Sequence, residues 1–149
     1  MKLKEFLVRV KQNTYASVDE DGENILVDGS KEIFYKEGDF KYRDRYFGSK
    51  TFVGEEIIWQ NNEALWSMNY YGGLTSNIKS AKEVYEFLKK AMKLVMADKP
   101  YRGPDEFKEG NFKYVNNVKG NLHSFKGEEK IFFKEQEIYH LNYHGGQIN

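Results

Sequence analysis

An internal repeat constrains the fold of this chain more than any other feature of the sequence. Two blocks recur in order: residues 35–48 as 107–120, and residues 52–73 as 125–146. Nearly half of the aligned positions are identical, which is far above chance for a match at a fixed period. Each copy is too short to be a comfortable domain on its own. We therefore expect a single domain, residues 1–149, made of two pseudo-symmetric halves at about 1–75 and 76–149.

Hydrophobic periodicity predicts one helix in each half. Apolar residues recur at helical spacing within residues 2–15, which indicates an amphipathic helix. Later in the chain, Ser80 and Glu83 fit a capping box, and an apolar helical face follows them. This second helix is expected to stop before Pro100, since proline restricts the residue that precedes it.

Alternation of apolar and polar residues predicts three strands in each repeat. The expected strands cover residues 40–46, 52–60 and 65–71, and then 112–118, 125–133 and 138–144. Short polar turns between consecutive strands indicate antiparallel meanders, whereas residues 17–31 predict a long polar loop. The fold class is α+β: an internally duplicated helix plus three-stranded antiparallel meander, with the two helices packed on a curved antiparallel sheet.

Composition argues against several classes of function. The chain carries 23 Lys and Arg against 23 Asp and Glu, so its net charge gives no reason to expect nucleic-acid or membrane binding. Without cysteine it has no disulfide, thiol nucleophile or thiolate metal site. The sequence shows neither a signal peptide nor an apolar run that could span a bilayer. A cytoplasmic, soluble protein is the expectation.

Strand pleating identifies one unusual acidic position in each half. Side chains two apart in a strand share a face, so Glu129 is predicted to lie with Phe125 and Ile131 on the apolar side. The same parity places its repeat partner Glu56 with Ile58. A carboxylate on an apolar face must be hydrogen-bonded, paired with a charge, protonated, or exposed to a wet cavity.

These glutamates lead to a candidate ligand site and to a structural alternative. As a site, an aromatic pocket with one or two perturbed carboxylates suits a cationic or polyhydroxylated small molecule, or acid–base chemistry. As structure, each glutamate would hold a turn or bulge beside its glycine through backbone hydrogen bonds. The candidate ligand-binding residues are Glu56, Glu129, Tyr42, Tyr114, Trp66, Tyr139, Arg102 and His144, and Tyr70 and Tyr143 are further possible partners of the glutamates.

No metal or cofactor is expected. His140 and His144 are four residues apart in a predicted strand, which separates them by about 13 Å, too far for one ion. The glycine pairs at 72–73 and 145–146 lack the lysine and hydroxyl residue of a phosphate-binding loop. His144 could still act alone as a base, although a surface histidine at a strand end is the simpler interpretation.

Several motifs together resemble an uncharacterised bacterial family of domains of unknown function. They are Pro-Tyr-Arg-Gly-Pro at 100–104, Glu-Gly-Asn-Phe-Lys-Tyr at 109–114, Phe-Lys-Gly-Glu-Glu at 125–129, Tyr-His-Gly-Gly at 143–146, Thr-Tyr-Ala at 14–16 and Asn-Tyr-Tyr-Gly at 69–72. The resemblance implies a domain that occurs alone or fused to helix-turn-helix regulators. It implies no activity and no catalytic residues, and this chain has no such DNA-binding module.

Three functions remain open from the sequence. The first is a non-enzymatic domain that binds a small ligand or a partner, with a role in transcriptional regulation by analogy with the fused relatives. The second is a small enzyme that uses a buried glutamate as general acid or base. The third is an assembly module in which exposed strand edges form a homodimer.

Overall fold

The computed structural model describes residues 1–14 and 24–149 as two helices and nine strands. The helices are α1 (Leu3–Asn13) and α2 (Ala81–Lys93). The strands are β1 (Asn24–Ile25), β2 (Lys31–Glu37), β3 (Phe40–Gly48), β4 (Thr51–Gln60), β5 (Glu63–Leu74), β6 (Glu106–Glu109), β7 (Phe112–Asn121), β8 (Ser124–Phe133) and β9 (Gln136–Gln147). They form one antiparallel sheet in the order β1-β2-β3-β4-β5-β9-β8-β7-β6. This content agrees with the expected α+β class.

The prediction of three strands in each half was incomplete. Strand β2 precedes β3, and strand β6 precedes β7, each paired antiparallel with the strand that follows it. Both are rich in Lys and Glu, which is typical of strands near a sheet edge and resembles a loop in sequence. The loop predicted over 17–31 is only partly tested: residues 15–23 lie outside the described residues, and the remainder contains β1.

Two-residue turns fix the register of the central hairpins. Asn61 and Asn62 connect β4 to β5 with positive φ, and Lys134 and Glu135 do the same between β8 and β9. Positive φ at both central positions is the type I′ geometry, whose twist matches that of the flanking strands. Asparagine tolerates this conformation better than lysine or glutamate does, so the second turn depends more on the surrounding sheet.

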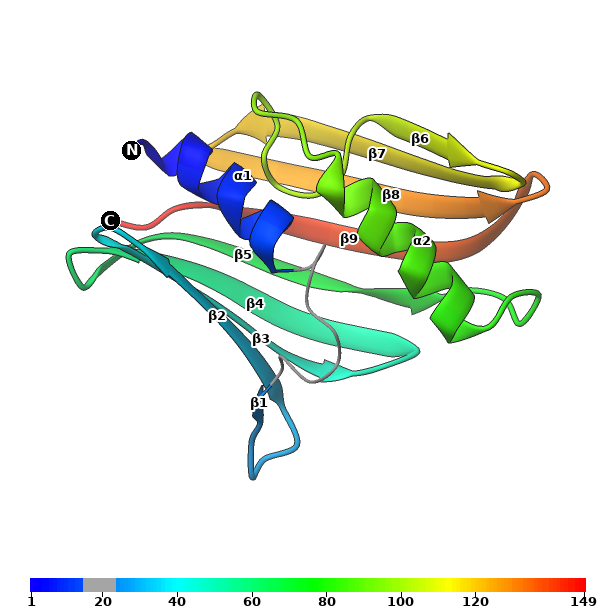
Figure 1. Ribbon diagram of the computed structural model, residues 1–149, viewed down its shortest axis with the longest axis horizontal. Coiled ribbons are helices and arrows are strands. Elements are labelled where there is room, and N and C mark those ends of the chain that lie inside the picture. The colour runs from blue at the N-terminus through cyan, green and yellow to red at the C-terminus, as the bar shows by residue number, and fades with distance from the viewer. Residues whose placement is uncertain (15–23) are drawn as a thin grey trace.

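The two sets of strands meet where β5 pairs with β9, at the middle of the sheet (Figure 1). Tyr70 lies opposite Tyr143 in this pair. On either side of them, Asn69 lies opposite His144 and Tyr71 opposite Asn142. In the repeat, Asn69 is equivalent to Asn142, and Tyr71 is equivalent to His144. The two pairs that flank the tyrosines therefore join the same two repeat positions, with the halves exchanged.

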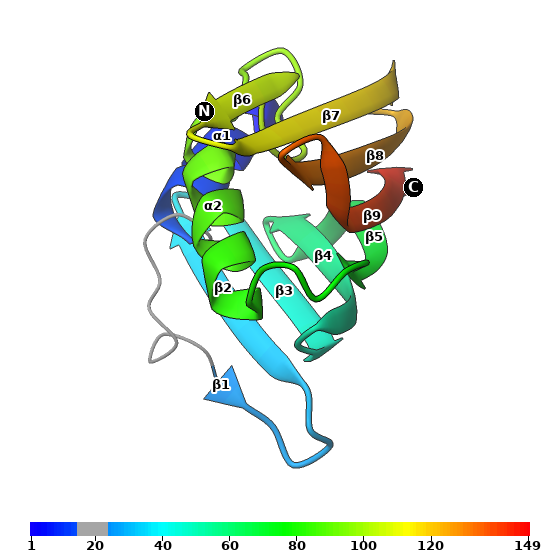
Figure 2. The ribbon, with the colours of Figure 1, turned by 90° about the vertical axis from the view of Figure 1, so that its right-hand side faces the viewer.

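Both helices lie on the same side of the curved sheet (Figures 1 and 2). Phe6 of α1 stacks on Phe40, and Phe87 of α2 stacks on Phe112, with ring centroids 4.9 and 5.0 Å apart. These rings belong to one continuous core. The capping box predicted at Ser80 is present at the start of α2. Within residues 1–14 and 24–149, neither helix is long and apolar enough to cross a membrane.

Candidate functional site

The two glutamates identified by strand parity are both fully buried, as predicted. Glu56 on β4 and Glu129 on β8 project from the face of the sheet that the helices cover. Gly54 and Gly127, two residues earlier in each strand, make room for tyrosine rings: a Cβ there would come within 2.2 Å of Tyr70 and 2.1 Å of Tyr143, respectively. The glycines therefore allow a tyrosine to pack beside each glutamate. The register irregularities of these strands occur further along, after Ile58 and Ile131, so neither glutamate sits at a bulge.

In the second half, Glu129 is saturated with hydrogen-bond donors. Arg102 donates from Nε to Oε2 at 3.1 Å and from Nη2 to Oε1 at 2.6 Å. Tyr114 donates to Oε2 and Tyr139 to Oε1, both at 2.6 Å. Although burial alone would raise the pKa of Glu129, the Arg102 charge and these hydrogen bonds lower it below its ordinary value. Glu129 is thus a buried anion with its two oxygens fully used. We call Glu129, Arg102, Tyr114 and Tyr139 the Glu129 centre.

The linker that supplies Arg102 also covers this centre. Gly103 donates its N–H to the Tyr114 hydroxyl at 3.1 Å, and its carbonyl accepts from Asn116 Nδ2 at 3.0 Å. Asn116 in turn accepts from the Tyr143 hydroxyl at 2.7 Å. The N–H and the carbonyl of Gly103 are therefore both hydrogen-bonded to side chains of the sheet. The predicted cationic role of Arg102 is directed at the chain's own glutamate.

In the first half, the equivalent glutamate has fewer partners. Lys11 of α1 and the Tyr42 hydroxyl both donate to Glu56 Oε1, at 2.5 and 2.6 Å. Glu56 Oε2 is buried and has no hydrogen-bond partner among the described residues. Trp66 occupies the position equivalent to Tyr139, but its buried Nε1 likewise has no partner within residues 1–14 and 24–149.

A second carboxyl group, Asp44 on β3, lies directly opposite Glu56 in the register of β3 and β4. Side chains so paired have Cβ atoms about 5 Å apart. Asp44 is fully buried, and its Oδ1 accepts from the Tyr70 hydroxyl at 2.6 Å. Its Oδ2 has no partner in the described part of the chain. We call Asp44, Glu56, Lys11, Tyr42 and Tyr70 the Asp44–Glu56 centre.

Burial and the neighbouring Glu56 charge raise the pKa of Asp44 to about 8. Burial also lowers the pKa of Lys11, although the Glu56 charge opposes this. The pKa of Tyr42 is raised well above its ordinary value by burial and by Glu56, so its hydroxyl stays a donor. At neutral pH the centre therefore tends to hold a proton on Asp44.

The structure brings together seven of the eight residues predicted for the site. Glu56, Tyr42 and Trp66 belong to the inner face of the first half, while Glu129, Tyr114, Tyr139 and Arg102 form the Glu129 centre. The two groups are neighbours, because the Arg102 guanidinium lies 5.8 Å from the centroid of the Tyr70 ring.

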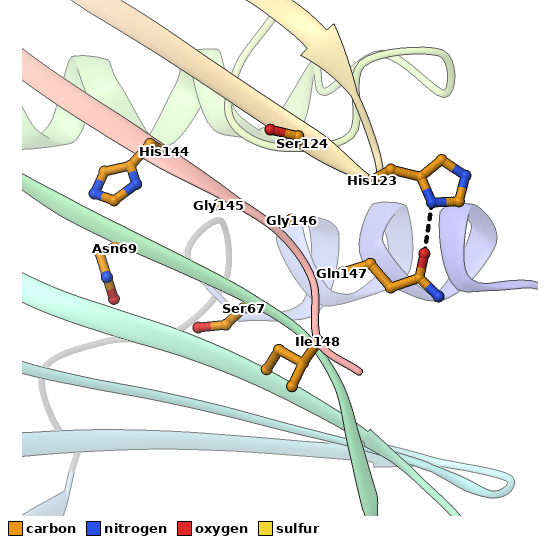
Figure 3. A pocket seen from close by; sticks show the side chains of 9 residues that line it. All are labelled: Ser67, Asn69, His123, Ser124, His144, Gly145, Gly146, Gln147 and Ile148. Carbon is orange, nitrogen blue, oxygen red and sulfur yellow. Dashed lines mark hydrogen bonds between the residues drawn. The ribbon is translucent and has the colours of Figure 1, made fainter.

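His144 is apart from the other predicted residues. It lies on the opposite face of β9 from Tyr143 and is exposed. There it lines a surface pocket of about 340 Å³ with the neighbouring Asn69 (Figure 3). In the same pocket, His123 Nδ1 and Gln147 Oε1 are 2.5 Å apart. His144 therefore cannot assist either buried glutamate directly.

Two residues of the buried site were missed in the sequence. Asp44 carries the same parity signal as Glu56, since it alternates with Tyr42 and Tyr46 in a predicted strand. Lys11 lies four positions after Leu7 and so falls on the apolar face of the first helix. A charged residue on an apolar face was a usable signal in both cases. No group of three His, Asp or Glu side chains among the described residues could hold a metal ion.

Comparison with known proteins identifies a family but no characterised relative. Neither the curated proteins nor the solved structures gave a match to this chain. A family model, described as a domain of unknown function (DUF5680), matches residues 44–148. The match includes Asp44, both glutamates and the linker that carries Arg102. Because it covers more than half of the chain, this protein belongs to the DUF5680 family of domains of unknown function.

Proposed function

We propose that this protein is a small-ligand-binding domain whose site is the Asp44–Glu56 centre on the inner face of the first half. The observation that carries the proposal is the pair of adjacent buried carboxyl groups, each with one oxygen that has no partner within the described residues. A buried acceptor without a donor costs roughly 1–3 kcal/mol. A ligand that donates to both oxygens would recover that cost.

The Glu129 centre has a different role in this proposal. Its carboxylate already accepts four hydrogen bonds, so a ligand would have to displace the protein's own groups. We assign Glu129, Arg102, Tyr114 and Tyr139 to holding the linker on the sheet. Tyr42 remains in the ligand site because it donates to the Glu56 carboxylate. Trp66 remains because it occupies the position equivalent to Tyr139, whose hydroxyl donates to Glu129.

The two halves are proposed to be copies of one helix-and-meander unit within a single domain. The exchange of equivalent positions around Tyr70 and Tyr143 in the β5–β9 pair supports this origin. Such a pair of copies leaves one free to hold a ligand while the other serves as scaffold. A role in transcriptional regulation would follow by analogy if relatives carry the domain behind a DNA-binding module.

A screen with matched variants tests the proposed site. The protein would be incubated with a library of small amines, polyols and acids. Binding would be followed by ligand-observed NMR. We expect at least one class to bind the unmodified protein and to lose binding in Asp44→Asn. Glu55→Gln is the control, because Glu55 lies on the same strand as Glu56 but on the exposed face. A crystal structure in which only water meets Asp44 and Glu56, together with no binding from any class, would refute the proposal.

Acid–base catalysis is a second candidate, favoured by one observation. Asp44, with its pKa raised to about 8, lies opposite Glu56, and a carboxyl group whose pKa lies near neutral pH suits general acid–base chemistry. If the protein is such an enzyme, both Asp44→Asn and Glu56→Gln should lose the chemical conversion of the bound ligand. At least one of these two variants should still bind the ligand. A ligand recovered chemically unchanged after long incubation would exclude this activity for that ligand.

A further inference from the structure

The linker peptide of the second half shows how the inner face of this sheet accommodates a polar group. Arg102 places its guanidinium on Glu129, and Gly103 presents an N–H to Tyr114 and a carbonyl to Asn116. Each of these partners has an equivalent in the first half. The repeat offset maps Glu129 to Glu56, Tyr114 to Tyr42, and Asn116 to Asp44.

The chemistry of one equivalent position is reversed in the first half. Asn116 accepts from Tyr143 through its oxygen and uses Nδ2 to donate to the Gly103 carbonyl. Asp44 accepts from Tyr70 in the same way, but in its ionised form its remaining atom is the acceptor Oδ2. A group placed there must donate a hydrogen, whereas the Gly103 carbonyl accepts one. Glu56 Oε2 makes the same demand.

The buried charges are also unequal in number. Apart from the tyrosines, the buried ionisable groups of the two centres among the described residues are two cations and three carboxyl groups: Lys11, Arg102, Asp44, Glu56 and Glu129. With every group ionised, the interior would carry one uncompensated negative charge. Buried charges without a partner are costly, so one further positive charge or one proton is required.

We infer that the first half binds a small monocation with N–H donors, a protonated primary amine or a guanidinium group, between Asp44 Oδ2 and Glu56 Oε2. This inference rests on the proposed ligand-binding function and names its ligand class. The cation supplies the donors that both oxygens lack, and it balances the third carboxylate.

A proton on Asp44 balances the charge when the cation is absent. The charged and titratable groups that face Asp44 are Glu56 on β4, Tyr70 on β5, Lys11 on α1 and Arg102 in the linker. Burial and Glu56 raise the pKa of Asp44 to about 8, against the opposing effects of the two cations and the tyrosine. Binding of the cation therefore releases this proton below pH 8.

The test uses simple probes of the three charge classes. Butylamine and methylguanidine represent the cations, butanol is the neutral comparison and butyrate is the anion. Isothermal titration calorimetry at pH 6, 7 and 8 would measure affinity, and buffers of different ionisation enthalpy would measure proton release. We expect the cations alone to bind, with affinity rising by up to about tenfold per pH unit over this range. About one proton should leave per cation bound at pH 6.

Two variants locate the binding. Asp44→Asn should lower cation affinity at least tenfold and abolish proton release, and its fold is checked by circular dichroism. Glu56→Gln is the second variant, and Glu55→Gln on the exposed face is the matched control that should bind as the unmodified protein does.

The outcomes separate this inference from the function on which it rests. Binding of butanol or butyrate, but of neither cation, that is lost in Asp44→Asn would overturn the cation assignment and leave a ligand site. Cation binding that is unchanged in Asp44→Asn would place the cation elsewhere and also overturn the inference. Failure of every probe and of the wider library would refute both.

Discussion

Glu56 and Glu129 occupy equivalent positions in the two halves, yet their surroundings differ in one decisive respect. Glu129 receives four hydrogen bonds on two oxygens, while the described partners of Glu56 both donate to a single oxygen. The difference follows from the element that supplies the cation. A linker brings Arg102 together with a peptide group, whereas α1 brings the single ammonium of Lys11. The same strand framework therefore holds one centre in which both carboxylate oxygens have donors, and another in which Asp44 and Glu56 each keep one oxygen without a donor among the described residues.

The largest effect on stability should come from removing the cation of the Glu129 centre. Arg102→Met leaves Glu129 buried without its charge partner, and breaking such a pair costs about 3–5 kcal/mol. Urea unfolding measures the loss. The control is Lys99→Met, since Lys99 is a solvent-exposed linker cation that pairs with Asp105 and should cost below about 1 kcal/mol. Equal losses in the two variants would contradict a special role for Arg102.

Removing the cation of the Asp44–Glu56 centre should have a smaller effect on stability. Lys11→Met deletes the donation to one oxygen of Glu56, and loss of a hydrogen bond between charged groups costs about 2 kcal/mol. Arg102→Met deletes two such hydrogen bonds, so the loss in Lys11→Met is expected to be the smaller. Lys4→Met, on the exposed side of the same helix, is the control in the same urea titration. A loss in Lys11→Met that exceeds the loss in Arg102→Met would reverse the comparison between the two centres.

The sequence predicted the framework better than it predicted this difference. Strand parity placed both glutamates on the inner face, and the repeat placed their tyrosines beside them. The partners of Glu56 and Glu129 could not be ranked, because the cations come from α1 and from the linker, which lie outside the aligned blocks. Packing of those segments on the sheet depends on the tertiary fold and not on strand periodicity.

Some misses had a signal that was not used. Asp44 shows the same alternation as Glu56, so its burial could be predicted from the strand alone. The strands β2 and β6 were hidden for a physical reason: near a sheet edge, charged side chains replace the apolar ones that identify a central strand. His144 was included among the candidate residues as a base at a strand end, although it follows Tyr143 and adjacent residues in a strand face opposite sides.

Exchanging the residues that differ between the halves tests the electrostatic part of the comparison. The folded-state pKa of Asp44 is raised to about 8 from an ordinary value of 3.8, so the folded protein binds a proton that the unfolded chain has lost. Stability from this group therefore falls as pH rises from about 4 to about 8, and is level above that. Asp44→Asn removes the dependence.

We expect the stability advantage of Asp44→Asn over the unmodified protein to grow by at least about 1 kcal/mol between pH 5 and pH 9. Urea unfolding at several pH values measures it. The reciprocal variant Asn116→Asp should lose stability as pH rises, because it adds a carboxyl group beside Glu129 and removes the donor to Gly103. A pH-independent difference for Asp44→Asn would show that Asp44 is ionised throughout this range.

The smallest effect should come from the aromatic position that differs between the halves. Tyr139 donates its hydroxyl to Glu129, whereas Trp66 leaves Glu56 Oε2 without a donor among the described residues. Trp66→Tyr and Trp66→Phe lose similar indole contacts, including the stacking on Phe125. Only the tyrosine can supply the missing hydrogen bond. We expect Trp66→Tyr to be more stable than Trp66→Phe by about 1 kcal/mol in thermal unfolding. Comparing the unmodified protein with Tyr139→Phe in the same assay measures what the equivalent hydroxyl contributes to stability in the Glu129 centre. If the two Trp66 variants unfold at the same temperature, a hydroxyl at position 66 does not reach Glu56. The Asp44–Glu56 centre then differs from the Glu129 centre in geometry as well as in its cation.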